Sequence, residues 1–425
     1  MKKWHHVIIV CLMLTVFACA PTMKDLSKLQ KNLTESDEKT RVNAAKDIGR
    51  IKESTPAVLP PLYSALKTDS SPEVRAEAAN SLGQLRFSEA KAPLTEALES
   101  DPNPEVRAAS ADALHRVAGH ASLDPLLNAL GKDGSPEVRA ACVKLAGKIG
   151  DQRATADIRK SLQADTSAKV RAQAAASLGE LKNQEDFKLL RDTAIKDQDK
   201  DVRVAAVLAI AFVPGNDSMD FLHDALGDSS LGDSALTAVQ KSGRALESPK
   251  LISRLIAMGD SSPKVDERIL QVLLEVDDSR ASSYIYRGIT DASYTSESEY
   301  VERCVNWFKA RGDISPVTRL MNDLRVSTQL KTQARIVHAL GYFQDARAVP
   351  MLLDMLKSRS QYSNCLPKHL MWAMAVRGDP LPWNYLCHLH CNDPDKNIRY
   401  EAGDALYHLY HNSRLRVKPQ VCKCK

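Results

Sequence analysis

SPEVRAEAANSLGQL, residues 71–85, decides the fold of this chain, because close copies of it return at a fixed interval. The copies are NPEVRAASADALHRV from residue 103, SPEVRAACVKLAGKI from residue 135, SAKVRAQAAASLGEL from residue 167 and KDVRVAAVLAIAF from residue 200. The arginine of each copy lies 32 residues after the previous one, and Arg41 lies 34 residues before Arg75. A period of about 20 to 50 residues indicates a stacked array of small units.

Each unit has the pattern of a helical hairpin. Ser71 is a favourable N-cap, and Pro72 falls at the first helical position, where the missing N–H of proline is tolerated. Apolar residues then follow at three- and four-residue steps from Val74 to Leu85, which predicts a helix with one apolar stripe. Another amphipathic segment precedes each such helix, as at 92–98. The repeat is therefore predicted to hold two antiparallel helices.

An aspartate stands six residues before the arginine of each copy, and this spacing returns near the C-terminus. The pattern resembles the HEAT family, specifically the PBS-lyase HEAT-like repeats, which pair an aspartate in the turn with an arginine in the second helix. GYFQDARAVPML, residues 341–352, resembles the same family's consensus. The predicted structural ladder consists of Asp69 and Arg75, Asp101 and Arg107, Asp133 and Arg139, Asp165 and Arg171, Asp197 and Arg203, and Asp393 and Arg399.

The resemblance implies an all-α fold, a right-handed alpha-alpha superhelix, or HEAT-like solenoid, of about twelve helical hairpins. In this fold a planar guanidinium holds a carboxylate and loop carbonyls that would otherwise go unpaired between helices. We expect each aspartate to pair with the arginine six residues after it. The ladder is interpreted as structural rather than ligand-binding.

The composition fits such an array. Hydrophobic residues make up 44% of the 425 residues, which suffices for a core, while aromatic residues at 5% favour helices rich in alanine and leucine over sheets. The net charge of +5 is small for a chain with 58 basic and 53 acidic residues. The charge balance therefore does not indicate a nucleic acid or an acidic partner.

Residues 1–18 have the pattern of a signal peptide, with Lys2 and Lys3 before a short apolar core. The sequence VFAC, residues 16–19, resembles the lipobox of bacterial lipoproteins, in which Cys19 receives a diacylglycerol and becomes the first residue. Ala20 after it resembles the sorting pattern for an outer membrane. The predicted localisation is the bacterial cell envelope, lipid-anchored at the outer membrane and facing the periplasm. The alternatives are ordinary secretion, for which Pro21 is an unfavourable first residue, and an uncleaved anchor.

The remainder divides by the strength of the repeat. We expect a lipidated lead-in over 19–36, regular repeats over 37–213 and C-terminal repeats over 301–412. Residues 214–300 are predicted to hold degenerate repeats and an irregular loop, because 277–300 show little amphipathic pattern. Residues 413–425 are predicted to be a basic, solvated tail, for which attraction to anionic lipid is the alternative.

The C-terminal cysteines and histidines are the strongest candidate for chemistry. Cys387 and Cys391 lie one helical turn apart, so both could face a metal together with outside ligands such as Cys365, His369, Cys422 or Cys424. The alternative is a set of packed or disulfide-bonded thiols, which an oxidising envelope favours. We expect the five cysteines after residue 360 to pair among themselves, in an order that sequence does not define. Cys142 and Cys304 are expected to be buried thiols.

Catalysis is the less favoured interpretation. The HEAT-like family includes bilin lyases and a di-iron hydroxylase, but the hydroxylase needs His-Glu dipeptides, and none of the eleven histidines here precedes a glutamate. The sequence has no Gly-x-Ser-x-Gly, phosphate-loop or His-Glu-x-x-His motif. We therefore expect no catalytic residue, no cofactor and no metal.

A protein partner is the favoured interpretation. In HEAT-type arrays the second helices line the concave side, and their outward positions fall nine residues after each ladder arginine. The predicted partner-facing residues are Gln84, Arg116, Lys148, Glu180 and Phe212. Their mixed chemistry argues against a nucleic-acid groove and suits a protein surface. The hypothesis is a membrane-anchored scaffold or adaptor, and the alternative is an enzyme or metal-binding protein that uses the C-terminal Cys/His cluster.

Overall fold

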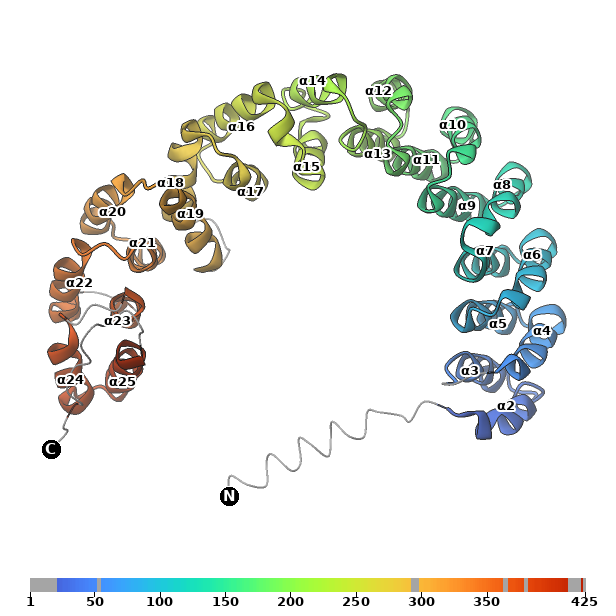
Figure 1. Ribbon diagram of the computed structural model, residues 1–425, viewed down its shortest axis with the longest axis horizontal. Helices are drawn as coiled ribbons and strands as arrows, with labels where there is room; N and C mark the ends of the chain where they lie inside the picture. The colour runs from blue at the N-terminus through green and yellow to red at the C-terminus, as the bar shows by residue number, and fades with distance from the viewer. Residues whose placement is uncertain are drawn as a thin grey trace. The chain divides into compact units, whose positions relative to one another are not determined.

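The computed structural model describes residues 21–51, 55–291, 298–361, 366–377, 381–411 and 422. Within these ranges the regular structure is helical, without a strand. The chain divides into two compact units, one ending at Ala238 and the other beginning at Val239 (Figure 1). None of the helices in the described ranges has both the length and the apolar character needed to cross a bilayer.

Unit 1 alternates first and second helices of successive hairpins. After α2 (Leu26–Asn32), the first helices are α4 (Leu59–Thr68), α6 (Lys91–Ser100), α8 (Leu123–Lys132), α10 (Thr155–Ala164), α12 (Phe187–Lys196) and α14 (Asn216–Ala225). The second helices are α3 (Glu38–Gly49), α5 (Pro72–Leu85), α7 (Pro104–Ala118), α9 (Pro136–Ile149), α11 (Ala168–Leu181) and α13 (Lys200–Ile210), and the next one, α15 (Gly232–Ser242), contains the boundary between the units. The predicted hairpins are thus confirmed.

The second helices begin where the capping signals predict. The Ser71 side chain accepts hydrogen bonds from the backbone N–H groups of Glu73 and Val74, and Pro72 is the first residue of α5. At the other end Arg86 takes the left-handed conformation, with φ 57°, and its N–H bonds to the Leu82 carbonyl. The repeat sequence therefore fixes both ends of the helix locally.

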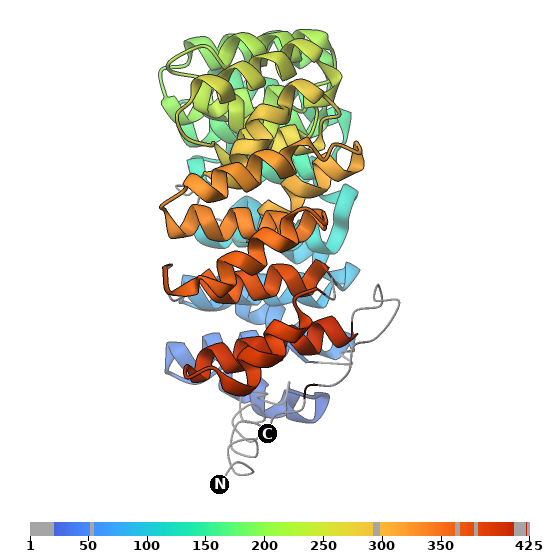
Figure 2. The same ribbon diagram turned by 90° about the vertical axis from the view of Figure 1, so that its left-hand side faces the viewer.

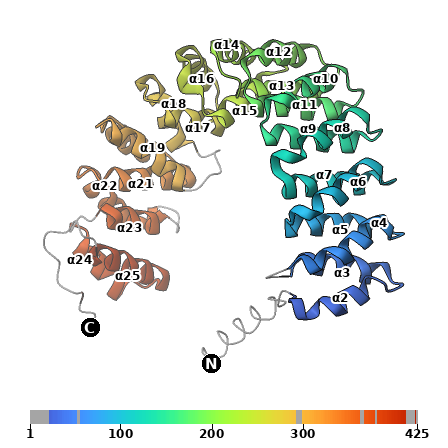
Figure 3. The ribbon, with the colours of Figure 1, turned by 45° about the vertical axis from the view of Figure 1, so that its right-hand side comes forward.

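Small residues let neighbouring second helices pack closely. A Cβ atom at Gly83 would lie 2.8 Å from the Cα atom of Ala113 on α7, and one at Gly147 would lie 2.6 Å from Ser177 on α11. The Ser177 hydroxyl also donates to a carbonyl of α9 at 3.1 Å. The first helices contact one another far less. Unit 1 therefore curves, with its second helices on the inner side (Figures 1 and 3).

Unit 2 continues with hairpins of less regular sequence. Its helices are α16 (Pro249–Ser261), α17 (Glu267–Glu275), α18 (Ser282–Thr290), α19 (Ser298–Ala310), α20 (Ser315–Val326), α21 (Leu330–Phe343), α22 (Ala348–Lys357), α23 (Leu366–Arg377), α24 (Trp383–Asn392) and α25 (Lys396–His411). Figure 2 shows the orange and red helices of this unit stacked in parallel rows. Successive second helices again pack against each other, as α21 does against α23 and α23 against α25.

Helix α18 corrects the expectation of an irregular loop over 277–300. Its Tyr284 and Ile289 are fully buried. The Tyr284 hydroxyl accepts from the Asp266 backbone N–H at 2.7 Å, so a polar tip is satisfied inside the core. Gly259 makes room for the tyrosine ring. The amphipathic pattern was missed because tyrosine fills apolar positions here, and the remaining part of that stretch, residues 292–297, lies outside the described ranges.

Candidate functional site

The ladder arginines join each repeat to the next. Arg75 donates from Nε and Nη2 to the carboxylate of Asp101 at 2.8 and 3.0 Å. Its Nη1 donates to the backbone carbonyls of Asp69 and Ser70 at 2.9 and 3.3 Å. One guanidinium thus holds the turn that precedes its own helix and the turn of the following repeat.

This geometry repeats along unit 1 and corrects the predicted pairing. From Arg75 to Arg171, the carboxylate belongs to the aspartate 26 residues after the arginine, not to the one six residues before it, whose backbone carbonyl is bound instead. The same two-pronged pairs are Arg107 with Asp133, Arg139 with Asp165, and Arg171 with Asp197. Arg41 makes the same pair with Asp69, which lies 28 residues after it. The sequence did not reveal this pairing, because every arginine from Arg75 to Arg171 has one aspartate at a fixed distance before it and another at a fixed distance after it.

The ladder changes at the end of the regular repeats. Arg203 keeps the bonds to the carbonyls of Asp197 and Gln198. In unit 2, Arg399 donates to the Asp393 carbonyl at 2.6 Å, whereas the Asp393 carboxylate pairs with Arg359. The predicted Asp393–Arg399 pair therefore also uses the backbone rather than the carboxylate.

Four ladder aspartates, Asp69, Asp133, Asp165 and Asp197, have a pKa lowered below the usual value. At Asp165 and Asp197 the hydrogen bonds from arginine lower the pKa below 3.8, more than burial raises it. At Asp133 burial raises the pKa, but the bonds from Arg107 and the Ser135 backbone N–H outweigh it, so this pKa also lies below 3.8. Carboxylates fixed in this way are suited to holding turns together rather than to transferring protons.

The predicted partner-facing residues lie on the layer of second helices. Gln84, Arg116, Lys148 and Glu180 are exposed on α5, α7, α9 and α11. Phe212 is half-buried and follows the end of α13. The structure places these side chains on successive helices of one layer, so a single bound molecule could contact several of them. Their contact with a partner stays a prediction.

An aromatic cluster that the sequence interpretation missed lies on α21 and α23. His338 Nε2 lies 2.9 Å from His369 Nδ1, a hydrogen bond between the two rings. The Trp372 ring lies 4.3 Å from that of His338 and 5.1 Å from that of Tyr342. Burial, together with the charge of His369, lowers the pKa of His338 to about 4. Most aromatic residues of the chain follow residue 280, and this enrichment is the sequence feature that could have indicated the cluster.

Three of the C-terminal cysteines are disulfide-bonded. Cys387 on α24 pairs with Cys422, and Cys391 is disulfide-bonded as well. Their sulfur atoms are therefore not thiolate ligands, and the described residues contain no group of three potential metal ligands. The expectation of pairing among the late cysteines is confirmed for Cys387 and Cys422. This disulfide joins Cys422 of the basic tail to α24, while the solvation of the tail stays a prediction.

The remaining cysteines divide into two buried thiols and four residues outside the described ranges. Cys142 and Cys304 are free and fully buried, as predicted. Burial raises the pKa of each thiol to about 12, so neither is a ready nucleophile. The described ranges do not include Cys11, Cys19, Cys365 and Cys424.

The sequence profile of HEAT repeats matches residues 26–115, 92–177, 123–211 and 156–241, which together span about half of the chain. The chain belongs to the HEAT-repeat family. No curated protein sequence matches it significantly.

Solved structures of HEAT-type solenoids resemble it at low identity. Kap121p is 13% identical, with a TM-score of 0.55 over 91% of this chain and 49% of its own. This chain thus spans about half the length of Kap121p, and the likeness shows the fold alone. The complex of CpcE and CpcF of phycocyanin lyase from a Nostoc species is 21% identical, covering 55% of this chain and 94% of that chain with a TM-score of 0.34.

One HEAT repeat carries a histidine where its neighbours carry glycine. His115 stands eight residues after Arg107, as Gly83 stands eight after Arg75. Its Nδ1 atom is buried and has no hydrogen-bond partner among the described residues. Burial and the nearby charge of Lys148 lower its pKa, which favours the neutral ring. His115 was not identified from the sequence, because the replacement of glycine by histidine is visible only when the repeats are aligned on their arginines.

Proposed function

We propose that this protein is a scaffold or adaptor that binds a protein partner on the exposed faces of its second helices. The observation that carries the proposal is the ladder, since each arginine fixes two consecutive turns and so fixes neighbouring second helices to each other. A layer fixed in this way presents side chains from many repeats at constant spacing. An extended partner then gains many small contacts on a surface that is already ordered.

The chemistry of that surface supports a protein ligand. Across four helices the exposed positions read Gln84, Arg116, Lys148 and Glu180, which includes both signs of charge and a neutral amide. A groove for nucleic acid needs basic residues along the phosphate path. A protein surface is itself mixed in charge and polarity. The electrostatic pattern therefore favours a protein partner over a nucleic acid.

We further propose that the scaffold is anchored to a bacterial envelope by acyl chains on Cys19. The support is the lipobox-like sequence before Cys19. The Cys387–Cys422 disulfide is consistent with an oxidising compartment, where such bonds persist. The same disulfides argue against the alternative of a metal enzyme built on Cys387 and Cys391, because both sulfur atoms are already bonded.

Charge reversal on one layer tests the binding face. The variant Arg116→Glu with Lys148→Glu alters second helices, and the control Lys91→Glu with Lys188→Glu makes the same change at exposed positions of first helices. Tagged proteins are expressed in the native host and captured with mild crosslinking. We expect wild type and control to recover the same discrete proteins and the second-helix variant to lose them. Equal recovery by both variants, or no specific recovery by wild type, contradicts the proposed face.

Fractionation tests the anchor separately. Cys19→Ser removes the acceptor of the lipid, so we expect the protein to leave the membrane fraction and appear in the soluble periplasmic fraction. The Cys142→Ser variant is the control, since this buried thiol lies in the core of unit 1. Retention of Cys19→Ser in the membrane fraction would overturn the anchor without bearing on the binding face.

A further inference from the structure

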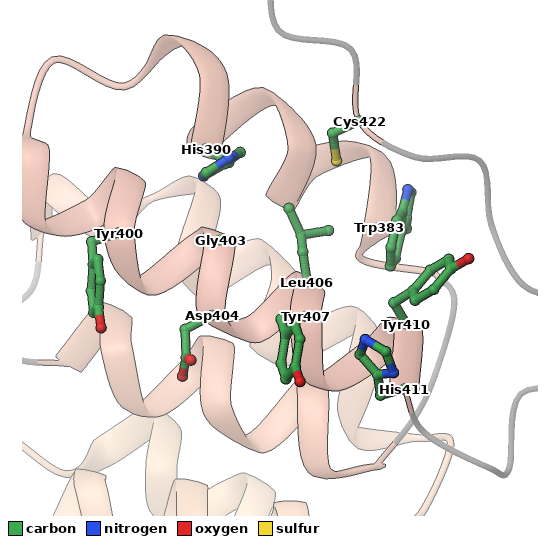
Figure 4. Close-up of a pocket in the computed structure, with 10 residues that line it drawn as sticks. All are labelled: Trp383, His390, Tyr400, Gly403, Asp404, Leu406, Tyr407, Tyr410, His411 and Cys422. Carbon is green, nitrogen blue, oxygen red and sulfur yellow. The ribbon is translucent and has the colours of Figure 1, made fainter.

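An aromatic groove lies at the last hairpin, between α24 and α25. Its volume is about 590 Å³. Figure 4 shows Tyr400, Asp404 and Tyr407 following one another along α25, with Trp383 and Tyr410 close together at one end. Trp383 is 7% exposed, whereas Tyr400 and Tyr407 are 74% and 61% exposed. The groove therefore has a buried aromatic floor at one end and two accessible tyrosines beside it.

The groove occupies the place where a further repeat would stack. Tyr407 stands eight residues after Arg399, at the position where Gly83 receives the next second helix in unit 1. A tyrosine there blocks the close helix contact that glycine permits. The exposed face of α25 carries aromatic rings with polar tips, the residue type enriched where surfaces bind.

Hydrogen-bonding groups are fixed around the rings. Gly403 leaves room for His390, because a Cβ atom there would lie 2.7 Å from Nδ1 of the imidazole. His390 Nδ1 lies 2.9 Å from the Arg399 carbonyl, so in the neutral ring Nδ1 donates and Nε2 is the acceptor. The tyrosine hydroxyls add donors beside the rings.

The described lining of the groove carries a negative charge. Among the described residues that line it, Asp404 is the one carboxylate, and none is lysine or arginine. His408 lies 3.7 Å from Asp404 and neutralises it only when protonated. At neutral pH the groove therefore favours a ligand with a basic group.

The spacing of the rings suits an extended ligand. Tyr400 and Tyr407 are seven residues apart on one helix, a rise of about 10.5 Å. A polyproline II helix repeats every three residues, about 9.3 Å, and leaves its carbonyls free to accept hydrogen bonds. Aromatic-lined grooves recognise such segments because they are already extended and lose little entropy on binding.

We infer that this groove binds a proline-rich peptide segment in the polyproline II conformation, with the rings contacting prolines and Asp404 pairing with a lysine or arginine of the segment. The segment belongs to another protein. The inference is independent of the proposed binding face on the second helices, which lies on other residues, so either can fail without the other.

A labelled peptide tests the inference on the oxidised, full-length mature protein. The probe is a fluorescein-labelled peptide of roughly twelve residues with two Pro-x-x-Pro turns and one arginine. The matched probe has alanine in place of each proline. Binding is followed by fluorescence anisotropy. We expect saturable binding of the proline probe and much weaker binding of the alanine probe.

Groove variants show whether the binding uses the predicted residues. Tyr400→Ala and Tyr407→Ala are expected to weaken binding by about fivefold or more each, as truncation of an interface anchor does. Asp404→Asn is expected to weaken binding of the arginine probe but not of a glutamine version. Val326→Ala, at a residue of unit 2 that is 77% exposed and outside the groove, should bind as wild type does.

Three outcomes would overturn the inference. They are equal affinity for the proline and alanine probes, unchanged binding by both tyrosine variants with circular dichroism like that of wild type, and binding that appears only after reduction of the Cys387–Cys422 disulfide. The last result would assign the groove to the protein's own C-terminal segment.

Discussion

Removal of Arg107 is the sharpest test of the ladder. The variant Arg107→Ala loses two bonds to the Asp133 carboxylate, at 2.7 and 2.8 Å, and two to the carbonyls of Asp101 and Pro102. Asp133 then keeps only the Ser135 backbone N–H as a donor. The Asp133 side chain is 6% exposed, so its charge is left in a site where water has little access.

The expected loss of stability is large because both side chains of the pair are mostly shielded from water. Breaking a buried ion pair costs about 3–5 kcal/mol, and the 16% exposure of Arg107 places this pair at the lower end, about 3 kcal/mol. Arg153→Ala is the control, because Arg153 is 63% exposed and pairs with Asp151 and Asp124 at the surface. We expect that variant to unfold at the urea concentration of wild type.

The assay is urea unfolding followed by circular dichroism, combined with a double-mutant cycle. Arg107→Ala and Asp133→Ala should show a coupling of about 2 kcal/mol. Arg107→Ala and Asp101→Ala should show a coupling within about 0.5 kcal/mol, because Arg107 binds the backbone of Asp101 and not its carboxylate. The reverse order of the two couplings would refute the register of the ladder.

Other consequences of the packing and electrostatics are equally accessible. Gly83→Ala should destabilise unit 1 by about 1–3 kcal/mol, because the added methyl group overpacks the contact with Ala113 on α7. Gly131→Ala should stabilise the protein by up to about 1 kcal/mol, because its Cβ would meet nothing within 4 Å. The urea concentrations at the midpoint of unfolding measure both effects. The pKa of Asp165 is lower in the folded state than its ordinary 3.8. The stability that Asp165 contributes is therefore fully present above pH 3.8 and is lost as the pH falls through the folded pKa. The free energy of unfolding, measured from pH 7 to 3, should decline only below about pH 4. Reduction of the Cys387–Cys422 disulfide, which closes 35 residues, should destabilise unit 2 by about 2–4 kcal/mol, and limited proteolysis with and without reductant should then show faster cleavage in unit 2 and unchanged cleavage in unit 1.

The regular repeats could be predicted from sequence because their signals are local. N-caps such as Ser71, the proline after it and the apolar stripe act within one helix, and they gave the bounds of α5 directly. The buried thiols of Cys142 and Cys304 followed from their place in an apolar stripe. Predictions that depend on the residues of a single helix therefore agree with the structure.

Features that depend on two repeats were harder to predict. Which carboxylate an arginine binds depends on whether its side chain reaches the turn of the next repeat. The repeat period alone does not distinguish that aspartate from the one six residues before the arginine. Gln333 shows the same limit, since its amide donates to the Ser327 carbonyl at 2.8 Å, six residues back, the bond that arginine makes elsewhere. A search for aspartate and arginine at the repeat spacing does not detect a glutamine that makes the same bond.

The groove could not be predicted because its parts are distant in sequence. Tyr400 and Tyr407 are visible as a pair on one helix, but Trp383 belongs to another helix and Cys422 to the tail. The disulfide that joins Cys422 to Cys387 is one of several pairings that the cysteine count allowed. Only the packing of the last hairpin brings these side chains to one place.

Site-specific photocrosslinking in intact cells tests the central claim most directly. A benzophenone amino acid is placed singly at Arg116 and Lys148 on second helices and at Lys188 on a first helix, all three exposed. The account predicts discrete protein adducts from Arg116 and Lys148, shared between these positions, and none from Lys188. Adducts confined to Lys188, or equal adducts from all three positions, would contradict binding through the layer of second helices.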